Sequence, residues 1–157
     1  MQQESFFNAI RQGDLKEVDK ALKEQPKLAH IKDQRGSTPL ILAAYYNHSE
    51  IVSSLLEHGA RVDDKDGVGN TALMGVCFKG YIEIAEQLMK AGANVNTTNT
   101  MGASCLIFAI TFNQPEIARL LLAHGADVDI KDARGNTALD HAKMQGFSHF
   151  EDILTPK

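Results

Sequence analysis

The chain has 157 residues and carries 16 Lys and Arg against 20 Asp and Glu, for a net charge of −4. This length predicts one domain with a self-sufficient core, and the acidic balance argues against a general binder of nucleic acid or anionic membranes, which would need a basic excess. The two cysteines, Cys77 and Cys105, exclude a disulfide scaffold and favour a reducing compartment. The sequence has no signal-peptide pattern and no apolar run as long as a membrane span, so we expect a cytoplasmic protein.

Residues 1–32 form the first and least regular unit of an internal repeat. Residues 13–18 have a pattern similar to residues 47–52, and after them a spacing of 33 residues recurs along the chain. Glycine and leucine both follow this spacing, at Gly36, Gly69, Gly102 and Gly135 and at Leu40, Leu73, Leu106 and Leu139. The first unit lacks the glycine-led turn and has Pro26 where later units have a Gly-Ala pair. We therefore expect it to cap a stacked array at its N-terminal end.

Each later unit begins with a turn and a first helix. Asp or Asn precedes Gly by three residues, the preference of a type I turn, and a hydroxyl residue two positions after Gly is suited to cap a helix. The hydroxyl residues are Thr38, Thr71, Ser104 and Thr137. The helix is expected to run for about eight residues to a Gly or Asn that tolerates the left-handed conformation. The closing residues are Asn47, Gly80, Asn113 and Gly146.

A second helix follows at once, and a short extended connection such as residues 60–65 leads from it to the next turn. The second helices are expected to end at Gly59, Gly92 and Gly125. The sequence predicts a single domain over 1–157, with internal units 33–65, 66–98 and 99–131 and a C-terminal capping unit 132–157. In this last unit Glu151 is polar where the internal units have small apolar residues, so no further unit is expected to stack on it.

The unit resembles the ankyrin repeat over nearly the whole chain. The best copy reads Gly-Ser-Thr-Pro-Leu-Ile-Leu-Ala-Ala at 36–44, followed by matching segments at 48–52 and 55–60. The resemblance implies an all-α solenoid of stacked helix-turn-helix units with projecting β-turn or hairpin loops. Its concave face is then formed by the first helices and the turn tips, and in this family that face commonly binds another protein. The family's usual His after Thr-Pro-Leu is replaced here, by Ile41, Met74, Ile107 and Asp140.

Motifs for catalysis or cofactor binding are weak. Residues 67–72 match the dinucleotide pattern G-x-G-x-x-A, but these are framework positions of the repeat and no adequate strand precedes them. The acidic run at 63–66 lacks the ligand spacing of a calcium loop. The histidines form no ligand cluster, with His30 and His48 isolated, and the cysteines occupy small core positions as inert thiols. We therefore expect no catalytic residue, no cofactor and no metal.

A row of large side chains is expected on the concave face instead. In the ankyrin unit the two residues before the closing Gly or Asn face that side, and here they are Tyr45 and Tyr46, Phe78 and Lys79, Thr111 and Phe112, and Met144 and Gln145. Exposed aromatic side chains are typical of interface hot spots. The alternative is that these side chains pack against the neighbouring unit and complete the stack. The turn tips add Arg35, Val68, Met101 and Arg134, which suit a peptide with an apolar centre and acidic ends.

The sequence therefore predicts a non-catalytic protein-binding module that acts as an adaptor or as a regulatory or inhibitory subunit. Its partner is expected to be another protein, with no nucleic acid and no membrane involved. A homo-oligomerising scaffold is the first alternative, so a monomer is expected and a homodimer is the competing state. A small enzyme or ligand-binding protein that uses the concave groove is the second alternative. It would need titratable groups that converge there.

Overall fold

The computed structural model describes residues 2–155, so the ends of the predicted 1–157 domain lie outside the described residues. This part of the chain is all helical. It contains α1 (Gln2–Gln12), α2 (Leu15–Glu24), a 3-10 helix (Pro26–His30), α3 (Pro39–Tyr45), α4 (Ser49–Glu57), α5 (Ala72–Lys79), α6 (Ile82–Lys90), α7 (Cys105–Thr111), α8 (Pro115–Ala123), α9 (Ala138–Gln145) and α10 (His149–Leu154). The predicted all-α solenoid is confirmed.

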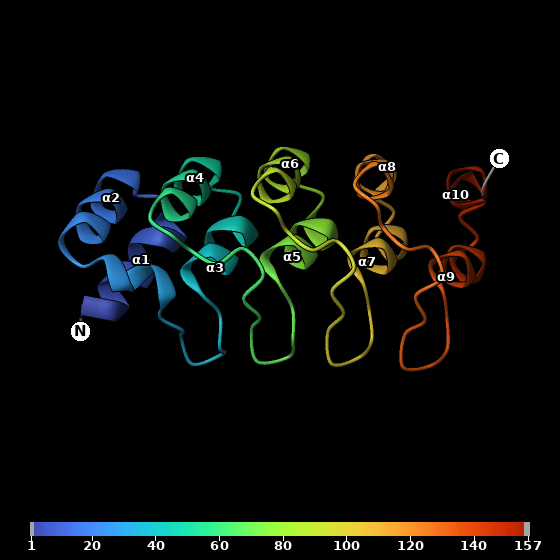
Figure 1. Ribbon diagram of the computed structural model, residues 1–157, viewed down its shortest axis with the longest axis horizontal. Helices are drawn as coiled ribbons and strands as arrows, with labels where there is room; N and C mark the ends of the chain where they lie inside the picture. The colour runs from blue at the N-terminus through green and yellow to red at the C-terminus, as the bar shows by residue number, and fades with distance from the viewer. Residues whose placement is uncertain (1, 156–157) are drawn as a thin grey trace.

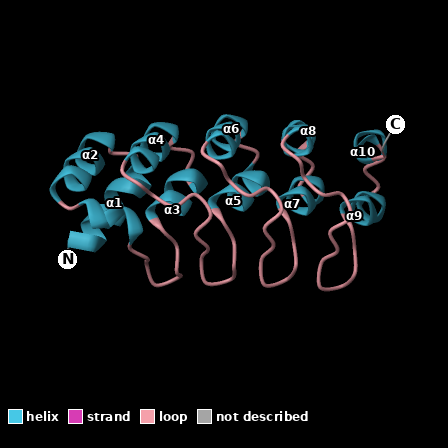
Figure 2. Ribbon diagram, viewed as in Figure 1, coloured by secondary structure: helices cyan, strands magenta, loops and turns pink. Residues whose placement is uncertain are grey.

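The helices stand in two parallel rows (Figure 1). The odd-numbered helices α1 to α9 form one row, here called the inner helices, and the even-numbered helices α2 to α10 form the other, the outer helices. Four long loops, here called the fingers, project beyond the inner helices on the side away from the outer helices; they are residues 31–38, 64–71, 97–104 and 130–137. The fingers are drawn as loops rather than strands in Figure 2.

The inner helices begin and end as the sequence predicts. The Thr71 hydroxyl accepts the backbone N–H of Met74 at 3.3 Å, and the Thr38 hydroxyl accepts that of Ile41 at 3.1 Å. These bonds satisfy N–H groups that the first helical turn leaves free. Gly80 closes α5 with φ +83°, and the same region is adopted by an asparagine, Asn47, at φ +63° after α3.

Each finger is shaped by an Asp or Asn side chain that bonds to its own turn. Asp66 Oδ1 accepts the backbone N–H groups of Val68 and Asn70, both at 2.9 Å. Adjacent fingers are then joined by backbone hydrogen bonds. Gly67 N–H donates to the Arg35 carbonyl at 3.1 Å, Thr100 N–H to the Val68 carbonyl at 3.1 Å, and Ala133 N–H to the Met101 carbonyl at 2.9 Å. The finger tips therefore form one connected row.

A continuous apolar core lies between the two rows of helices. Repeated leucines of the outer helices are fully buried, among them Leu55, Leu88 and Leu121. The inner helices contact one another more extensively than the outer helices do. Closer spacing on one side bends a stack toward that side, so the inner helices lie on its concave side.

Two local predictions need correction. The connection at 60–65 is not simply extended, because Asp64 N–H donates to the Arg61 carbonyl at 3.4 Å and closes a turn there. The first unit also contains the short 3-10 helix Pro26–His30, which begins at Pro26, the residue that replaces the Gly-Ala pair. Proline suits a helix start because its fixed φ is already helical and its missing N–H has no partner to lose.

Candidate protein-binding face

The ends of the inner helices expose the large side chains that the sequence places there. Tyr45, Tyr46, Phe78, Phe112 and Met144 keep between 38% and 62% of their surface accessible to solvent. Tyr45, Tyr46, Phe78 and Phe112 are here called the aromatic row. Burying such rings would be favourable, so their exposure marks this surface as a candidate binding site.

The first half of the aromatic row combines tyrosines with a cation. The rings of Tyr45 and Tyr46 meet edge to face with centroids 5.6 Å apart. The Lys79 ammonium lies 4.9 Å from the Tyr45 ring centroid and 6.0 Å from that of Tyr81. Tyr45 reaches the next inner helix over Gly75, where a Cβ would lie 4.0 Å from the ring. Cation–π attraction thus holds Lys79 beside the row while it stays exposed.

The second half is a phenylalanine cluster that crosses from α5 to α7. Phe78 and Phe112 meet edge to face with centroids 4.5 Å apart. Phe108, one helical turn before Phe112, stacks on it with centroids 6.3 Å apart. The two predicted alternatives, exposure and packing against the next unit, are therefore both realised: each ring contacts a neighbour and still presents a face to solvent.

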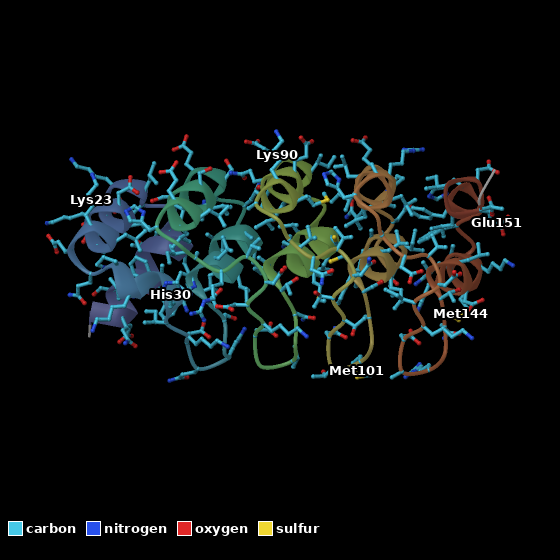
Figure 3. The ribbon with its side chains drawn as sticks, in the orientation of Figure 1. Lys23, His30, Lys90, Met101, Met144 and Glu151 are labelled. Atoms are coloured by element: carbon cyan, nitrogen blue, oxygen red, sulfur yellow. The ribbon has the colours of Figure 1, made fainter. Side chains whose placement is uncertain are left out.

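Other predicted contact residues differ in how far they are exposed. Lys79 and Gln145 are exposed, and Figure 3 shows Met144 beside α9. Thr111 is only half exposed, and its hydroxyl is buried without a hydrogen-bond partner in the part of the chain that the structure describes. Its hydroxyl therefore faces the stack, and its role as a contact for a partner stays a prediction.

Two contributors were missed by the sequence analysis, Phe108 and Tyr81. Phe108 stands four residues before Phe112, the spacing at which helical side chains meet, so this signal was present in the sequence. Tyr81 lies after the closing glycine of α5, and its approach to Lys79 depends on the path of the turn. No spacing rule predicts that approach.

The finger tips extend the same face. Arg35, Val68, Met101 and Arg134 occupy equivalent positions in the four fingers, and all four side chains are exposed. Met101 lies at the far end of its finger in Figure 3. Because backbone hydrogen bonds join adjacent fingers, these side chains are presented from a fixed row rather than from independent loops.

The acidic groups of this face are engaged within the protein. Asp132 is the clearest case: burial opposes its ionisation, but hydrogen bonds from the Asn136 and Arg134 backbones and from His141 outweigh it and lower its pKa. Asp140 also has a lowered pKa, chiefly because it accepts the Thr137 backbone N–H. Asp140 stands where the family has His, and here it completes a capping box with Thr137.

The two cysteines contact each other, and several histidines have hydrogen-bond partners within the protein. Cys77 and Cys105 are fully buried free thiols in contact with each other, and burial first, then the hydrogen bond with Cys105, raises the pKa of Cys77. His48 is predicted to be isolated from other metal-ligating side chains, and its Nε2 lies 3.1 Å from the Arg11 carbonyl oxygen. His58 Nδ1 lies 2.8 Å from the Ser54 carbonyl near the end of α4. Among residues 2–155, no three metal-ligating side chains gather at one place.

The outer side has a shallow groove between α6 and α8. It encloses about 410 Å³ and is lined by Ile82, Glu86, Glu116, Arg119, Leu120 and Ala123. Between α4 and α6 the corresponding space is bridged, because Gln87 Nε2 donates to the Ser49 carbonyl at 3.0 Å and to the Ser53 hydroxyl at 2.8 Å. Leu120 stands one repeat after Gln87 and cannot make such bonds.

No helix of the described chain has the length and apolarity to span a bilayer.

Comparison with known proteins agrees with the repeat seen in the sequence and the structure. A family model described as ankyrin repeats in three copies matches residues 6–99, and a second, described as ankyrin repeats in many copies, matches residues 88–142. A search of curated proteins gave no match. The recurring turn, helix pair and finger, together with these matches, show that the chain belongs to the ankyrin repeat family.

Proposed function

We propose that this chain is a non-catalytic protein-binding module whose concave inner face holds a segment of a partner protein. Ankyrin repeats generally mediate protein–protein interaction. The observation that carries the proposal is the exposed aromatic row, whose tyrosine pair on α3 and phenylalanine pair on α5 and α7 lie at the ends of successive inner helices. Its role for the partner is that of an adaptor or of a regulatory subunit in the cytoplasm.

The geometry supports tight binding because the row is already ordered. Phe78 and Phe112 hold each other across the gap between α5 and α7, and Tyr45 is held between Gly75 and Lys79. Side chains that are fixed before binding lose little rotamer entropy when a partner covers them. Aromatic anchors in such positions commonly supply most of the binding free energy of an interface.

Self-association is the competing function, and one observation favours it. The outer helices carry an excess of carboxylates, while the inner face presents exposed cations. The outer side of one copy could therefore attract the inner face of another. Such a head-to-tail contact joins two different surfaces, so it would produce rings or open chains rather than a two-fold dimer.

The test is affinity capture from a lysate of the source cells with the purified protein as bait. The test variant is Tyr46→Ala combined with Phe112→Ala. The matched control is Ile82→Ala combined with Leu120→Ala, which removes two large apolar side chains from the outer groove instead. Circular dichroism establishes that both variants fold, and sedimentation of the bait alone establishes whether it is a monomer.

The proposal expects a monomeric bait and a partner that the control variant retains and the aromatic-row variant loses. A partner retained by the aromatic-row variant would place binding elsewhere. Concentration-dependent growth of the bait into larger species, abolished by Tyr46→Ala and Phe112→Ala, would instead establish self-association.

A further inference from the structure

We infer that the partner segment is acidic and amphipathic, with apolar side chains over the Phe78–Phe112 pair and carboxylates facing Lys79, Arg35 and Arg134. This inference rests on the proposed function and specifies the chemistry of the partner. It commits to a segment of another protein. A second copy of this chain and a single-stranded nucleic acid are the alternatives that the test distinguishes.

The three cations are available to a partner. Lys79, Arg35 and Arg134 are all exposed, and none has a carboxylate partner within ion-pair distance among residues 2–155. The Lys79 ammonium lies 4.9 and 6.0 Å from two ring centroids and has no ion-pair partner among residues 2–155. A carboxylate that approaches it would add an ion pair at the edge of an apolar surface, where the effective dielectric is lower than in water.

The acids of the same face form no ion pair with these three cations among residues 2–155. Asp33 Oδ1 accepts the backbone N–H groups of Arg35 and Ser37, both at 2.9 Å, and its Oδ2 lies 3.8 Å from Arg11. Asp66 makes the same pair of turn bonds in the next finger. These carboxylates are fixed in the turns by hydrogen bonds, whereas the guanidinium and ammonium groups extend into solvent.

The outer side carries the opposite net charge, which strengthens the preference of an acidic segment for the inner face. The outer helices carry the carboxylates Glu17, Asp19, Glu24, Glu50, Glu57, Glu83, Glu86, Glu116, Glu151 and Asp152 and the cations Lys16, Lys20, Lys23, Lys90 and Arg119. Figure 3 shows Lys90 and Glu151 on this side, away from the finger tip of Met101. An acidic segment is therefore repelled by the outer helices and attracted to the inner face. A nucleic acid would meet the same repulsion over a much longer charged backbone.

The spacing of the row sets the length of the segment. Arg35 and Arg134 are separated by three repeat steps, and neighbouring helix layers lie about 8–10 Å apart, which gives a span of roughly 24–30 Å. An α-helix of about 16–20 residues covers this span, as does an extended strand of about 7–9 residues. A displayed peptide of about 20 residues is long enough for either form.

The experiment uses three displayed libraries of such peptides and the full chain. All three contain Leu, Phe, Ala and Ser at random, and they differ only in their polar residues: Asp and Glu, Asn and Gln, or Lys and Arg. A fluorescent oligothymidine is the nucleic-acid probe. Selected peptides are then titrated by fluorescence anisotropy against the wild type, Lys79→Glu, Lys90→Glu and Phe78→Ala with Phe112→Ala.

Lys90→Glu is a closely matched control for Lys79→Glu. Lys79 ends α5 and Lys90 ends α6, both are exposed, and both lose the same favourable interaction with the end of the helix dipole. The two variants differ in the face that they alter. We expect enrichment of the acidic library, a loss of affinity of at least about tenfold in Lys79→Glu, and a change below about twofold in Lys90→Glu.

Each other result overturns a defined part of the account. Enrichment of the neutral or basic library, with binding still lost in the Phe78→Ala and Phe112→Ala variant, would overturn the acidic partner and leave the proposed function standing. No enrichment from any library, or binding unaffected by that variant, would contradict both. Binding of oligothymidine that depends on Phe112 would replace the protein partner with a nucleic acid. If the chain alone formed oligomers and Lys79→Glu dispersed them, the occupant of the inner face would be a second copy of the chain.

Discussion

The two sides of this solenoid are built from the same repeat and differ in how neighbouring units are joined. On the finger side the joints are backbone hydrogen bonds that recur from unit to unit, as from Gly67 to Arg35 and from Thr100 to Val68. On the outer side they are side-chain bonds that change from one gap to the next, such as Ser54 to Asp19. The fingers are therefore joined through the backbone from one unit to the next, whereas the contacts between outer helices depend on the local side chains.

The joint between fingers is the feature whose loss should cost most. Gly36 has φ +80°, and a Cβ there would lie 2.8 Å from the backbone nitrogen of Gly67. Gly36→Ala should therefore lower the free energy of unfolding by about 2–3 kcal/mol, from left-handed strain plus the collision. Urea denaturation measures the loss.

The matched control for that variant lies on the outer side. Gly125, after α8, has a similar φ of +89° but nothing within 4 Å of its Cβ position. Gly125→Ala should cost only about 1–2 kcal/mol, from backbone strain alone. Equal losses in the two variants would show that close packing between fingers contributes nothing to stability.

From the second unit on, capping separates the two rows of helices, whereas in the first unit the outer helix α2 is capped by Asp14. Each of α3, α5, α7 and α9 has a side-chain cap, whereas α4, α6 and α8 have none. Thr71→Ala should destabilise the protein by about 1 kcal/mol, and Thr71→Ser should restore most of the loss. Gln114→Ala, at the uncapped start of α8, removes no cap and only the long 3.5 Å hydrogen bond from Gln114 Nε2 to the Phe78 carbonyl, so it should cost less than about 0.5 kcal/mol in the same thermal or urea assay. If Gln114→Ala lost more stability than Thr71→Ala, side-chain caps would not distinguish the stability of the inner helices from that of the outer helices.

Gly75 is a position where a substitution is expected to stabilise the inner row of helices. It lies inside α5 without a positive φ, and a Cβ there meets only Tyr45 at an ordinary contact distance of 4.0 Å. Gly75→Ala should raise the free energy of unfolding by about 0.5–1 kcal/mol, because alanine loses less backbone entropy in a helix. Destabilisation instead would mean that Tyr45 needs the space above the glycine.

The smallest expected effect is a pH dependence in the last finger. A carboxylate whose pKa is lowered by folding stabilises the protein above its unfolded pKa of about 3.9, and this stabilisation is lost as the pH falls through the folded value. Asp132 is such a group. Asp132→Asn keeps the turn, since Asn99 makes the equivalent bonds in the preceding finger, to Met101 N–H and Ala103 N–H, both at 3.0 Å.

Unfolding of both proteins is followed from about pH 7 to about pH 3. The advantage of the wild type over Asp132→Asn should be largest near neutral pH and should shrink in the acid range. An advantage that grows as the pH falls would contradict the lowered pKa of Asp132.

Much of the scaffold could be predicted from sequence because its determinants are local and periodic. A hydroxyl cap such as Thr71 and a closing residue such as Gly80 act within one helix, and the repeat multiplies each signal. The 3-10 helix at Pro26–His30 was missed because it occurs only in the irregular first unit.

The site was predictable only in part. The row Tyr45, Phe78 and Phe112 followed from repeat register. Which rings touch depended on contacts between units, as with Tyr45 over Gly75, and these have no sequence period. Thr111 shared the register of Tyr45 and Phe78, yet its hydroxyl is buried, and the repeat register does not predict this difference.

The most direct test of the central claim is an NMR titration of the isotopically labelled chain with the tightest acidic peptide from the selection. Binding on the inner face predicts that the largest chemical-shift changes fall on residues 45–46, 78–79 and 112 and on the finger tips. The signals of Ile82 and Leu120 in the outer groove should stay in place. Shifts centred on that groove, with the aromatic row unchanged, would contradict the account.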